Sequence, residues 1–222
     1  MRGRVAAFCL AVCVAGCATA LAFIPVTPLL STALSARAND DGTAKVIVDY
    51  EIRKDWQGLA GFASAQIQRD PDDTDWWVIL AFARIQLKQY AQAIEILNRV
   101  IARSPEDVDP RNLLGEALRL SGHPIEAAQV LERAVSISSN TAATRFLLGE
   151  AYRDDNRLER AKEAYRDAVV IDADFGPAWA GLAAVLARTG PRDEFEAAMK
   201  QLTRLEPELA RQFLESSRSP RN

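Results

Sequence analysis

Cysteine and histidine are almost missing from this chain of 222 residues. Cys9, Cys13 and Cys17 are the only cysteines, so the chain beyond them has neither disulfides nor thiol metal ligands. His123 is the single histidine, and its Ser-Gly-His-Pro context is typical of a turn between two helices. One histidine without partners forms neither a metal site nor a catalytic triad. We therefore expect no metal site, no cofactor and no catalytic residue, and the chain is predicted not to be an enzyme.

The chain also lacks a strong excess of charge of either sign. It has 27 Lys and Arg against 30 Asp and Glu, with a net charge of -3, and no run of basic residues. Proteins that bind nucleic acids present a basic face to the phosphates. We therefore expect no nucleic-acid partner.

What the sequence does contain is a unit of 34 residues that recurs. Leucine occupies position 7 of four consecutive units: Leu80, Leu114, Leu148 and Leu182. The next residue is small in every unit, and position 20 is alanine in three of them: Ala93, Ala127 and Ala161. Position 15 holds a residue that can end a helix in the left-handed conformation, and only Lys88 departs from this: Gly122, Asn156 and Gly190. A fixed period over four units indicates an internal repeat.

The most complete unit includes the stretch from Arg145 to Ala168, and it resembles the tetratricopeptide repeat. In that helix-turn-helix unit, small residues at positions 8 and 20 let the two helices approach closely, and larger apolar residues fill the space around them. One unit cannot bury its apolar face alone, so neighbouring units must stack. The resemblance implies an all-α fold, a right-handed superhelical solenoid of antiparallel helix pairs that follows an N-terminal apolar segment.

The period divides the chain into units. We expect four full repeats at residues 74–107, 108–141, 142–175 and 176–209. Residues 44–73 read as a degenerate capping repeat, in which Ile47 and Leu59 replace the small residues. In the last repeat Phe195 stands at position 20, so wider helix packing is expected there. Residues 36–43 are predicted to be a polar linker, 208–215 a C-terminal capping helix, and 216–222 a flexible tail.

Residues 1–35 are predicted to be a signal peptide or membrane anchor. Arg2 and Arg4 precede a long uncharged stretch, which is typical of an export signal that keeps its N-terminus inside the cell. Val14-Ala15-Gly16-Cys17 resembles the bacterial lipobox, which implies cleavage before Cys17 and its acylation. Residues 18–34 remain apolar, however, where a lipoprotein usually continues into a polar tether.

Two other interpretations of this segment stay open. Residues 5–24 have about the 20-residue length of an uncleaved membrane-spanning helix, and small residues around Ala20 would allow cleavage after it. All three interpretations place the repeats outside the cytoplasm. We therefore expect a bacterial cell-envelope protein whose repeats face the periplasm.

The resemblance also implies a binding surface. In this family, positions 2, 5, 6, 9, 12 and 13 of each first helix face a concave groove. The predicted partner-binding residues are three from each of the first three repeats: Val78, Phe82, Ile85, Asn112, Glu116, Arg119, Phe146, Glu150 and Arg153. Two phenylalanines beside two Glu/Arg pairs would suit an amphipathic helix or an extended peptide. The alternative is that these pairs are solvated i,i+3 pairs, each contributing about 0.2–0.5 kcal/mol.

These features predict a non-catalytic scaffold or adaptor that is attached to a membrane by its N-terminal segment. It would hold a peptide or helix of a protein partner while an envelope complex is assembled. Family members that clamp a C-terminal carboxylate carry lysines and asparagines where this chain has Val78, Phe82 and Leu113, so no such clamp is expected. Two alternatives are an accessory or regulatory subunit of an envelope enzyme and an apocytochrome chaperone. The second rests on Asp70-Pro71-Asp72-Asp73 followed by Trp77, which resembles the start of cytochrome c maturation repeat domains.

Overall fold

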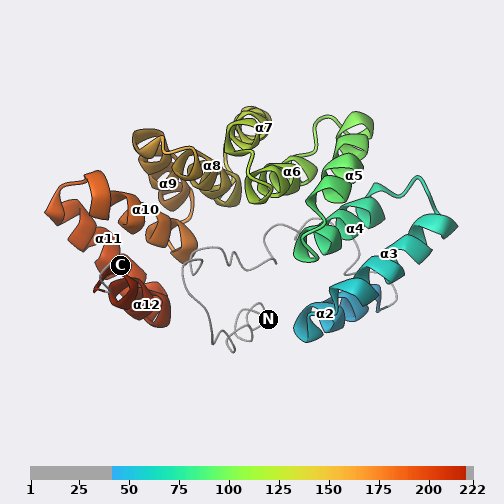
Figure 1. The fold of residues 1–222 in the computed structure, drawn as a ribbon, viewed down its shortest axis with the longest axis horizontal. Coiled ribbons are helices and arrows are strands. Elements are labelled where there is room, and N and C mark those ends of the chain that lie inside the picture. Colours follow the sequence, from blue (N-terminus) through green and yellow to red (C-terminus); the bar gives the residue numbers. More distant parts are fainter. Residues whose placement is uncertain (1–41, 219–222) are drawn as a thin grey trace, which may run out of the picture.

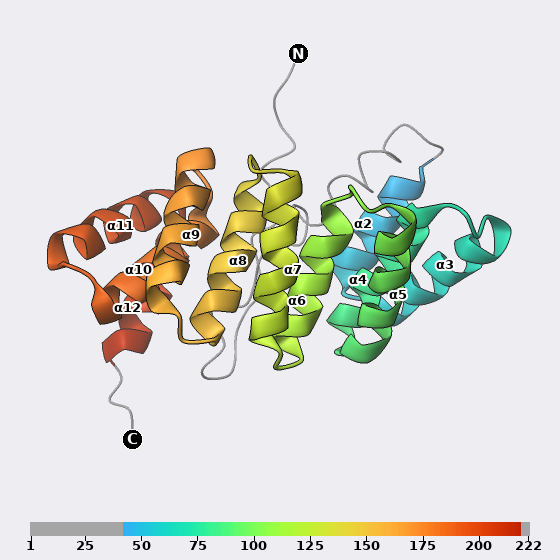
Figure 2. The ribbon, with the colours of Figure 1, turned by 90° about the horizontal axis from the view of Figure 1, so that it is seen from above.

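The computed structural model describes residues 42–218, which form eleven helices and no strand (Figure 1). The helices are α2 (Thr43–Arg53), α3 (Trp56–Arg69), α4 (Thr74–Gln86), α5 (Tyr90–Arg103), α6 (Asp109–Leu120), α7 (Pro124–Ile137), α8 (Ala142–Asp154), α9 (Leu158–Ile171), α10 (Gly176–Thr189), α11 (Arg192–Leu205) and α12 (Pro207–Arg218). Successive pairs stack along one direction, as Figure 2 shows from above. The predicted all-α solenoid is confirmed.

The helices follow an arc with an inner and an outer row (Figure 1). The first helices of successive repeats, α4, α6 and α8, lie on the concave side, and α5, α7 and α9 lie on the convex side. Helices α2 and α12 lie at the two ends of the arc. The predicted signal or anchor segment, with Cys17, falls outside the described residues. Within residues 42–218, no helix combines the length and apolar character that crossing a membrane requires.

The repeated small residues mark the closest approach within each helix pair. A Cβ atom on Gly149 would lie 2.6 Å from Cε1 of Tyr165, and one on Gly115 would lie 2.5 Å from Cγ of Leu131. Position 8 therefore opposes the large residue at position 24 of the second helix. The alanines at position 20 and the leucines at position 7 are buried beside this contact.

Four successive units end their first helix in the left-handed conformation at position 15. The positive φ angles are 53° at Lys54, 60° at Lys88, 87° at Gly122 and 59° at Asn156. Lys88, which was expected to depart, adopts the shared conformation because the turn closes with backbone hydrogen bonds. The N–H groups of Lys88 and Gln89 donate to the carbonyls of Ile85 and Arg84, each at 2.8 Å.

Gly190, by contrast, does not adopt the left-handed conformation predicted for it. Its φ is -96° and its ψ is 164°, which is extended backbone. The next residue is Pro191, which has no N–H to make the second closing bond and whose ring favours extended backbone at the residue before it. The prediction for this turn is therefore wrong for a local covalent reason.

Both ends of the array carry larger residues where the full repeats have small ones. Ile47 and Leu59 are completely buried in the N-terminal pair. Phe195 of α11 contacts Phe213 of α12, with ring centroids 6.3 Å apart. Its large side chain thus packs on the terminal helix. Helix α12 begins at Pro207, because proline is favourable in the first turn of a helix, and it ends at Arg218, three residues beyond the expected 215.

Candidate binding site on the inner helices

The nine predicted binding residues lie on three neighbouring inner helices. Helix α4 carries Val78, Phe82 and Ile85; α6 carries Asn112, Glu116 and Arg119; and α8 carries Phe146, Glu150 and Arg153. They occupy the same three positions in each repeat because the period is constant. The structure therefore brings them onto adjacent turns of one inner row.

These side chains are far more buried than the sequence analysis expected. Seven of the nine residues are no more than 8% exposed, and Glu150 is 2% exposed. The interpretation of the two Glu/Arg pairs as solvated pairs is therefore wrong. A buried carboxylate is costly unless it is paired and hydrogen-bonded, so its partners become the main question about the site.

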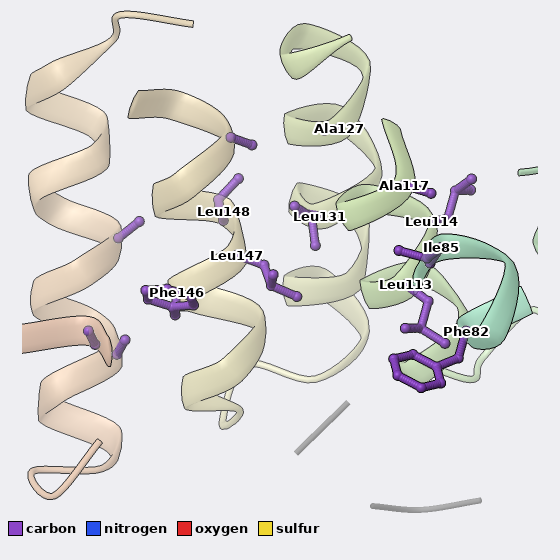
Figure 3. Close-up of a cluster of buried hydrophobic side chains, with 14 of the residues drawn as sticks. Phe82, Ile85, Leu113, Leu114, Ala117, Ala127, Leu131, Phe146, Leu147 and Leu148 are labelled. Carbon is purple, nitrogen blue, oxygen red and sulfur yellow. The ribbon is translucent and has the colours of Figure 1, made fainter. Parts of the chain in front are cut away.

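The two phenylalanines pack against other aromatic rings of the fold. Phe82 meets Trp56 of α3 edge-on, with ring centroids 5.6 Å apart. Phe146 lies against Tyr165 of α9 at 5.8 Å and Phe175 at 5.6 Å. Figure 3 shows Phe82 and Phe146 with leucines from α6 and α8 in one apolar cluster. Truncating either ring would therefore weaken the helix packing as well as any binding surface.

The first part of an ionic network centres on Arg119. Its Nε and Nη2 atoms donate to the two carboxylate oxygens of Glu116, both at 2.9 Å. Its Nη1 atom donates to Oδ2 of Asp154 on the next inner helix, at 2.7 Å. Arg119 therefore satisfies one carboxylate within its own helix and links α6 to α8.

The second part surrounds Glu150. Arg153 donates to both of its carboxylate oxygens, at 2.6 and 2.7 Å, and the Tyr165 hydroxyl of α9 donates to the same group. Arg153 also lies 3.3 Å from Asp154. We call these six residues the ionic network: Glu116, Arg119, Glu150, Arg153, Asp154 and Tyr165. It connects three helices from two repeats.

Burial and charge shift the acid–base behaviour of this network. Burial raises the pKa of Glu150, although the nearby Arg153 charge and the Tyr165 hydroxyl oppose that shift. Burial and the Glu150 charge raise the pKa of Tyr165 well above its ordinary value. Burial alone would lower the pKa of Arg119, but the hydrogen bond and charge of Glu116 raise it. Burial alone would likewise lower the pKa of Arg153, but the charge of Glu150 raises it, so both guanidinium groups remain charged.

The network has no unpaired guanidinium group that could bind a negatively charged ligand. Three carboxylates face two guanidinium groups, and each guanidinium already contacts two of those carboxylates. A ligand carboxylate would have to displace one of them from a buried position. This arrangement favours a segment that brings no negative charge.

One polar atom beside the network is not satisfied. The Oδ1 atom of Asn112 is buried and has no hydrogen-bond partner among the residues described, and Asn112 itself is 2% exposed. Asn112 lies one helical turn before Glu116 on α6. A buried acceptor without a donor costs about 1–3 kcal/mol. A donor that reached this atom would remove that cost.

Sequence reasoning missed two members of the network. Asp154 directly follows Arg153, at position 13, which was expected to face inward. The sequence of a single repeat does not show that Arg119 of the previous repeat contacts it. Tyr165 is at position 24, where the other full repeats have Leu97, Leu131 and Met199. The hydroxyl at this otherwise apolar position was the signal for a buried polar partner.

The described part of the chain contains no group of three or more His, Cys, Asp or Glu residues placed to hold a metal ion. His123 is exposed in its turn before α7, and its Nδ1 lies 3.1 Å from the Ser121 hydroxyl. This matches the predicted turn position.

Comparison with known proteins agrees with the repeat geometry. A family profile described as tetratricopeptide repeat matches residues 60–117 and 118–186, together more than half of the chain. No curated protein matches the sequence.

Solved structures share the fold at low sequence identity. The chain resembles TTC0263, a tetratricopeptide repeat protein of Thermus thermophilus, with 18% identity, a TM-score of 0.67, and coverage of 78% of this chain and 96% of that one. It also resembles MamA from Desulfovibrio magneticus RS-1, with 20% identity, a TM-score of 0.58 and coverage of 79% and 94%. A third similar structure is that of YrrB, which is described as having an unusual peptide-binding site. Its sequence identity is 16%, its TM-score is 0.57, and the match covers 86% of this chain and 98% of YrrB. The chain belongs to the tetratricopeptide repeat family.

Proposed function

We propose that this protein is a non-catalytic scaffold that binds an extended, uncharged segment of a protein partner along its inner helices. The observation that carries the proposal is the unpartnered Oδ1 of Asn112 beside an ionic network whose guanidinium groups are already engaged. The extended backbone of a peptide supplies N–H donors. A neutral segment avoids competition with the buried carboxylates.

The fold supports this kind of activity. Tetratricopeptide repeats form protein-interaction surfaces, and YrrB, with a similar fold, is described as having an unusual peptide-binding site. A C-terminal carboxylate is a poorer ligand here because it would need a free cation near the network. We therefore favour an internal segment of the partner over its C-terminus.

We place this scaffold at the periplasmic face of a bacterial membrane, where it takes part in assembling an envelope complex. Support comes from Arg2 and Arg4 before the apolar stretch and from the lipobox-like residues that end at Cys17. Mass spectrometry of the purified protein's N-terminus tests this location. An N-terminal, acylated Cys17 in wild type, with no acylation in Cys17→Ser, would support a lipoprotein. An intact Met1 terminus in wild type would exclude a lipoprotein.

The binding site is tested with a matched pair of variants. Asn112→Leu removes the unpartnered acceptor on the inner row, and Thr144→Val removes another buried, unpartnered oxygen on α8. Neither change should lower the melting temperature much, because neither breaks a hydrogen bond between described residues. Affinity capture from envelope extracts should recover a partner with wild type and Thr144→Val, and much less with Asn112→Leu.

The captured partner also decides between assignments. A c-type apocytochrome would support the chaperone alternative, and an envelope enzyme would support an accessory subunit. If Asn112→Leu retained the partner as well as wild type, the inner row would not be the binding site. The exposed convex face would then be examined.

A further inference from the structure

The two ends of the helix array have outer surfaces of different character. Terminal units of stacked arrays usually carry a polar outer face, which keeps the end of the array in solution. Helix α12 follows this rule, since Glu208 and Arg211 form an exposed ion pair on it. Helix α2, at the other end in Figure 1, carries exposed Val46, Val48 and Ile52, at 40%, 41% and 73%. They are half of the six large apolar residues that are exposed in the described part of the chain.

The side of α2 that packs on the array is a different one. Ile47 is completely buried, and the ring of Tyr50 lies against Phe62 of α3, with centroids 6.0 Å apart. These contacts fix how α2 is rotated on its neighbour. They leave Val48 and Ile52, one helical turn apart, on the outer surface.

A row of small and aliphatic residues therefore runs along the outer side of α2. Ala44, Val48 and Ile52 are spaced by four residues and cover about 12 Å of the helix. We call these three residues the α2 row. Each helix pair in a stacked array is stabilised by the next one, but within residues 42–218 no helix precedes α2. The α2 row thus continues the stacking direction at the open end of the described array.

We propose that the α2 row binds the α2 row of a second copy of this chain, with the two helices antiparallel about a two-fold axis at Val48. Val48 then meets Val48 of the second copy, and Ala44 of each chain meets Ile52 of the other. Both copies use the same surface, so the contact closes at a dimer. Helix α12 has only Leu214 as an exposed large apolar residue among its described side chains. A head-to-tail contact between the two ends is therefore not expected.

One charged residue beside the α2 row supports the antiparallel arrangement. Glu51 lies three residues after Val48, on the same side of the helix, and its Oε1 atom is buried with no hydrogen-bond partner among the described residues. The N-terminus of a helix is positively polarised, and a carboxylate beside it is favourable. In α2, neither the preceding Gly42 nor an acidic residue in the first turn supplies that carboxylate. Antiparallel pairing brings Glu51 of each copy next to the first turn of the other copy's α2.

The exposed charges on the other flank do not oppose the contact. Residues before Val48 in one copy face residues after it in the other, so Lys45 comes near Asp49 of the second copy. Asp49 already pairs with Arg53 in its own helix, and all of these side chains are exposed. The added attraction is therefore small, but no like charges are brought together. The apolar row supplies the main driving force.

Such a dimer would present two inner rows to one partner, and linked binding sites reinforce one another. The inference does not rest on the proposed function, because the α2 row contains none of the nine predicted binding residues. Loss of partner binding at the inner row would leave the dimer intact.

The test is disulfide cross-linking of the full chain. Cys9→Ser, Cys13→Ser and Cys17→Ser give a cysteine-free background, because the chain has no other cysteine. Val48→Cys is added in one protein and Val46→Cys in a second. The two positions are equally exposed, at 41% and 40%, but they are about 200° apart around the helix. Mild oxidation should join two Val48→Cys chains in increasing yield as the protein concentration is raised, and Val46→Cys chains only at background level.

A second arm identifies the surface that holds the copies together. Ile52→Asp is introduced into the Val48→Cys protein, where it would place a charge in the apolar contact and reduce cross-linking to background. Val170→Asp on the outer helix α9 is the control, since Val170 is 83% exposed, and it should leave the yield unchanged. Both substitutions replace exposed side chains, so neither should disturb the fold.

Two results would overturn the inference. One is an equal yield from Val46→Cys and Val48→Cys, including no link from either, because the α2 row would then have no preference for a second copy. The other is cross-linking that survives Ile52→Asp, because the two chains would then be held together by another surface.

Discussion

The central and flanking inner helices use the same backbone positions for different chemistry. In α6 and α8, positions 9 and 12 are occupied by glutamate and arginine, whereas α4 has Phe82 and Ile85, and α10 has Ala184 and Ala187. Phe82 needs only an apolar neighbour, which Trp56 supplies. Glu150 needs donors from its own helix and from α9.

This difference shows how an array of similar repeats can differ locally in specificity. A hydrophobic contact tolerates small shifts between helices, because it is not directional. A buried hydrogen-bonded ion pair does not, because its partners must stay within a narrow range of distance and angle. The Arg119–Asp154 link therefore fixes the second and third repeats relative to each other more strictly than the alanines of α10 fix the fourth.

Arg119→Met should lower the free energy of unfolding more than any other substitution considered, because it breaks the buried ion pairs that distinguish α6 and α8 from α4 and α10. It leaves Glu116 and Asp154 without their principal partner, and breaking one member of a buried pair costs about 3–5 kcal/mol. Urea unfolding followed by circular dichroism measures this loss. Arg192→Met is the control, since Arg192 and Glu196 form an exposed i,i+4 pair, and no measurable change is expected there. Equal, small effects of the two substitutions would remove the distinction between buried and surface pairs.

Gly149→Leu should have the next largest effect. A Cβ at Gly149 would lie 2.6 Å from the buried ring of Tyr165, and overpacking of this kind costs about 1–3 kcal/mol. Gly61→Leu in α3 is the control, since nothing lies within 4 Å of a Cβ at that position. Thermal melting should fall for the first variant and stay level or rise for the second. A Gly149→Leu protein that melts like wild type would contradict the helix contact at position 8.

Glu150→Gln should change how the stability of the protein depends on pH. An acid with a raised pKa in the folded state binds its proton more readily there than in the unfolded chain, so its ionised form costs stability at neutral pH. That cost is relieved as the pH falls through the raised pKa towards the ordinary value of 4.5. Glutamine cannot titrate. From about pH 7 to about pH 5, wild type should gain stability relative to the variant.

Urea unfolding of both proteins at the two pH values measures this effect. The two curves are compared at each pH, because other carboxylates titrate equally in both proteins. A difference that stays constant with pH, or that shifts in favour of Glu150→Gln on acidification, would contradict the assignment of Glu150 as a desolvated carboxylate.

Lys88→Gly should have the smallest effect, and it should be stabilising. A residue other than glycine pays about 1 kcal/mol in the left-handed conformation, and Lys88 has a φ of 60°. Gly122→Ala is the matched control and should be destabilising, because Gly122 has a φ of 87°. No neighbour lies within 4 Å of the added Cβ, so the change tests the backbone conformation alone. Thermal melting should rise slightly for the first and fall slightly for the second. The same direction of change in both would mean that these turns relax to another conformation.

The sequence by itself determined the solenoid. The 34-residue period, the leucine at position 7 and the small residue beside it express contacts that recur within each helix pair, so they can be read without knowing how distant repeats meet. Helix ends were predictable where local residues decide them. The turn at Lys88 was not predictable, because its backbone hydrogen bonds overcame the propensity of lysine. The turn at Gly190 was predicted wrongly because the adjacent Pro191, which is visible in the sequence, lacks the N–H that closes the other turns.

Only the tertiary structure decided the chemistry of the inner row. Glu116 with Arg119, and Glu150 with Arg153, have a spacing that is equally compatible with a solvated pair and with a buried one. The deciding partners are Asp154, 35 residues from Arg119, and Tyr165 on a different helix from Glu150. Whether a carboxylate is buried depends on how neighbouring repeats pack, and spacing within one helix carries no information about that packing.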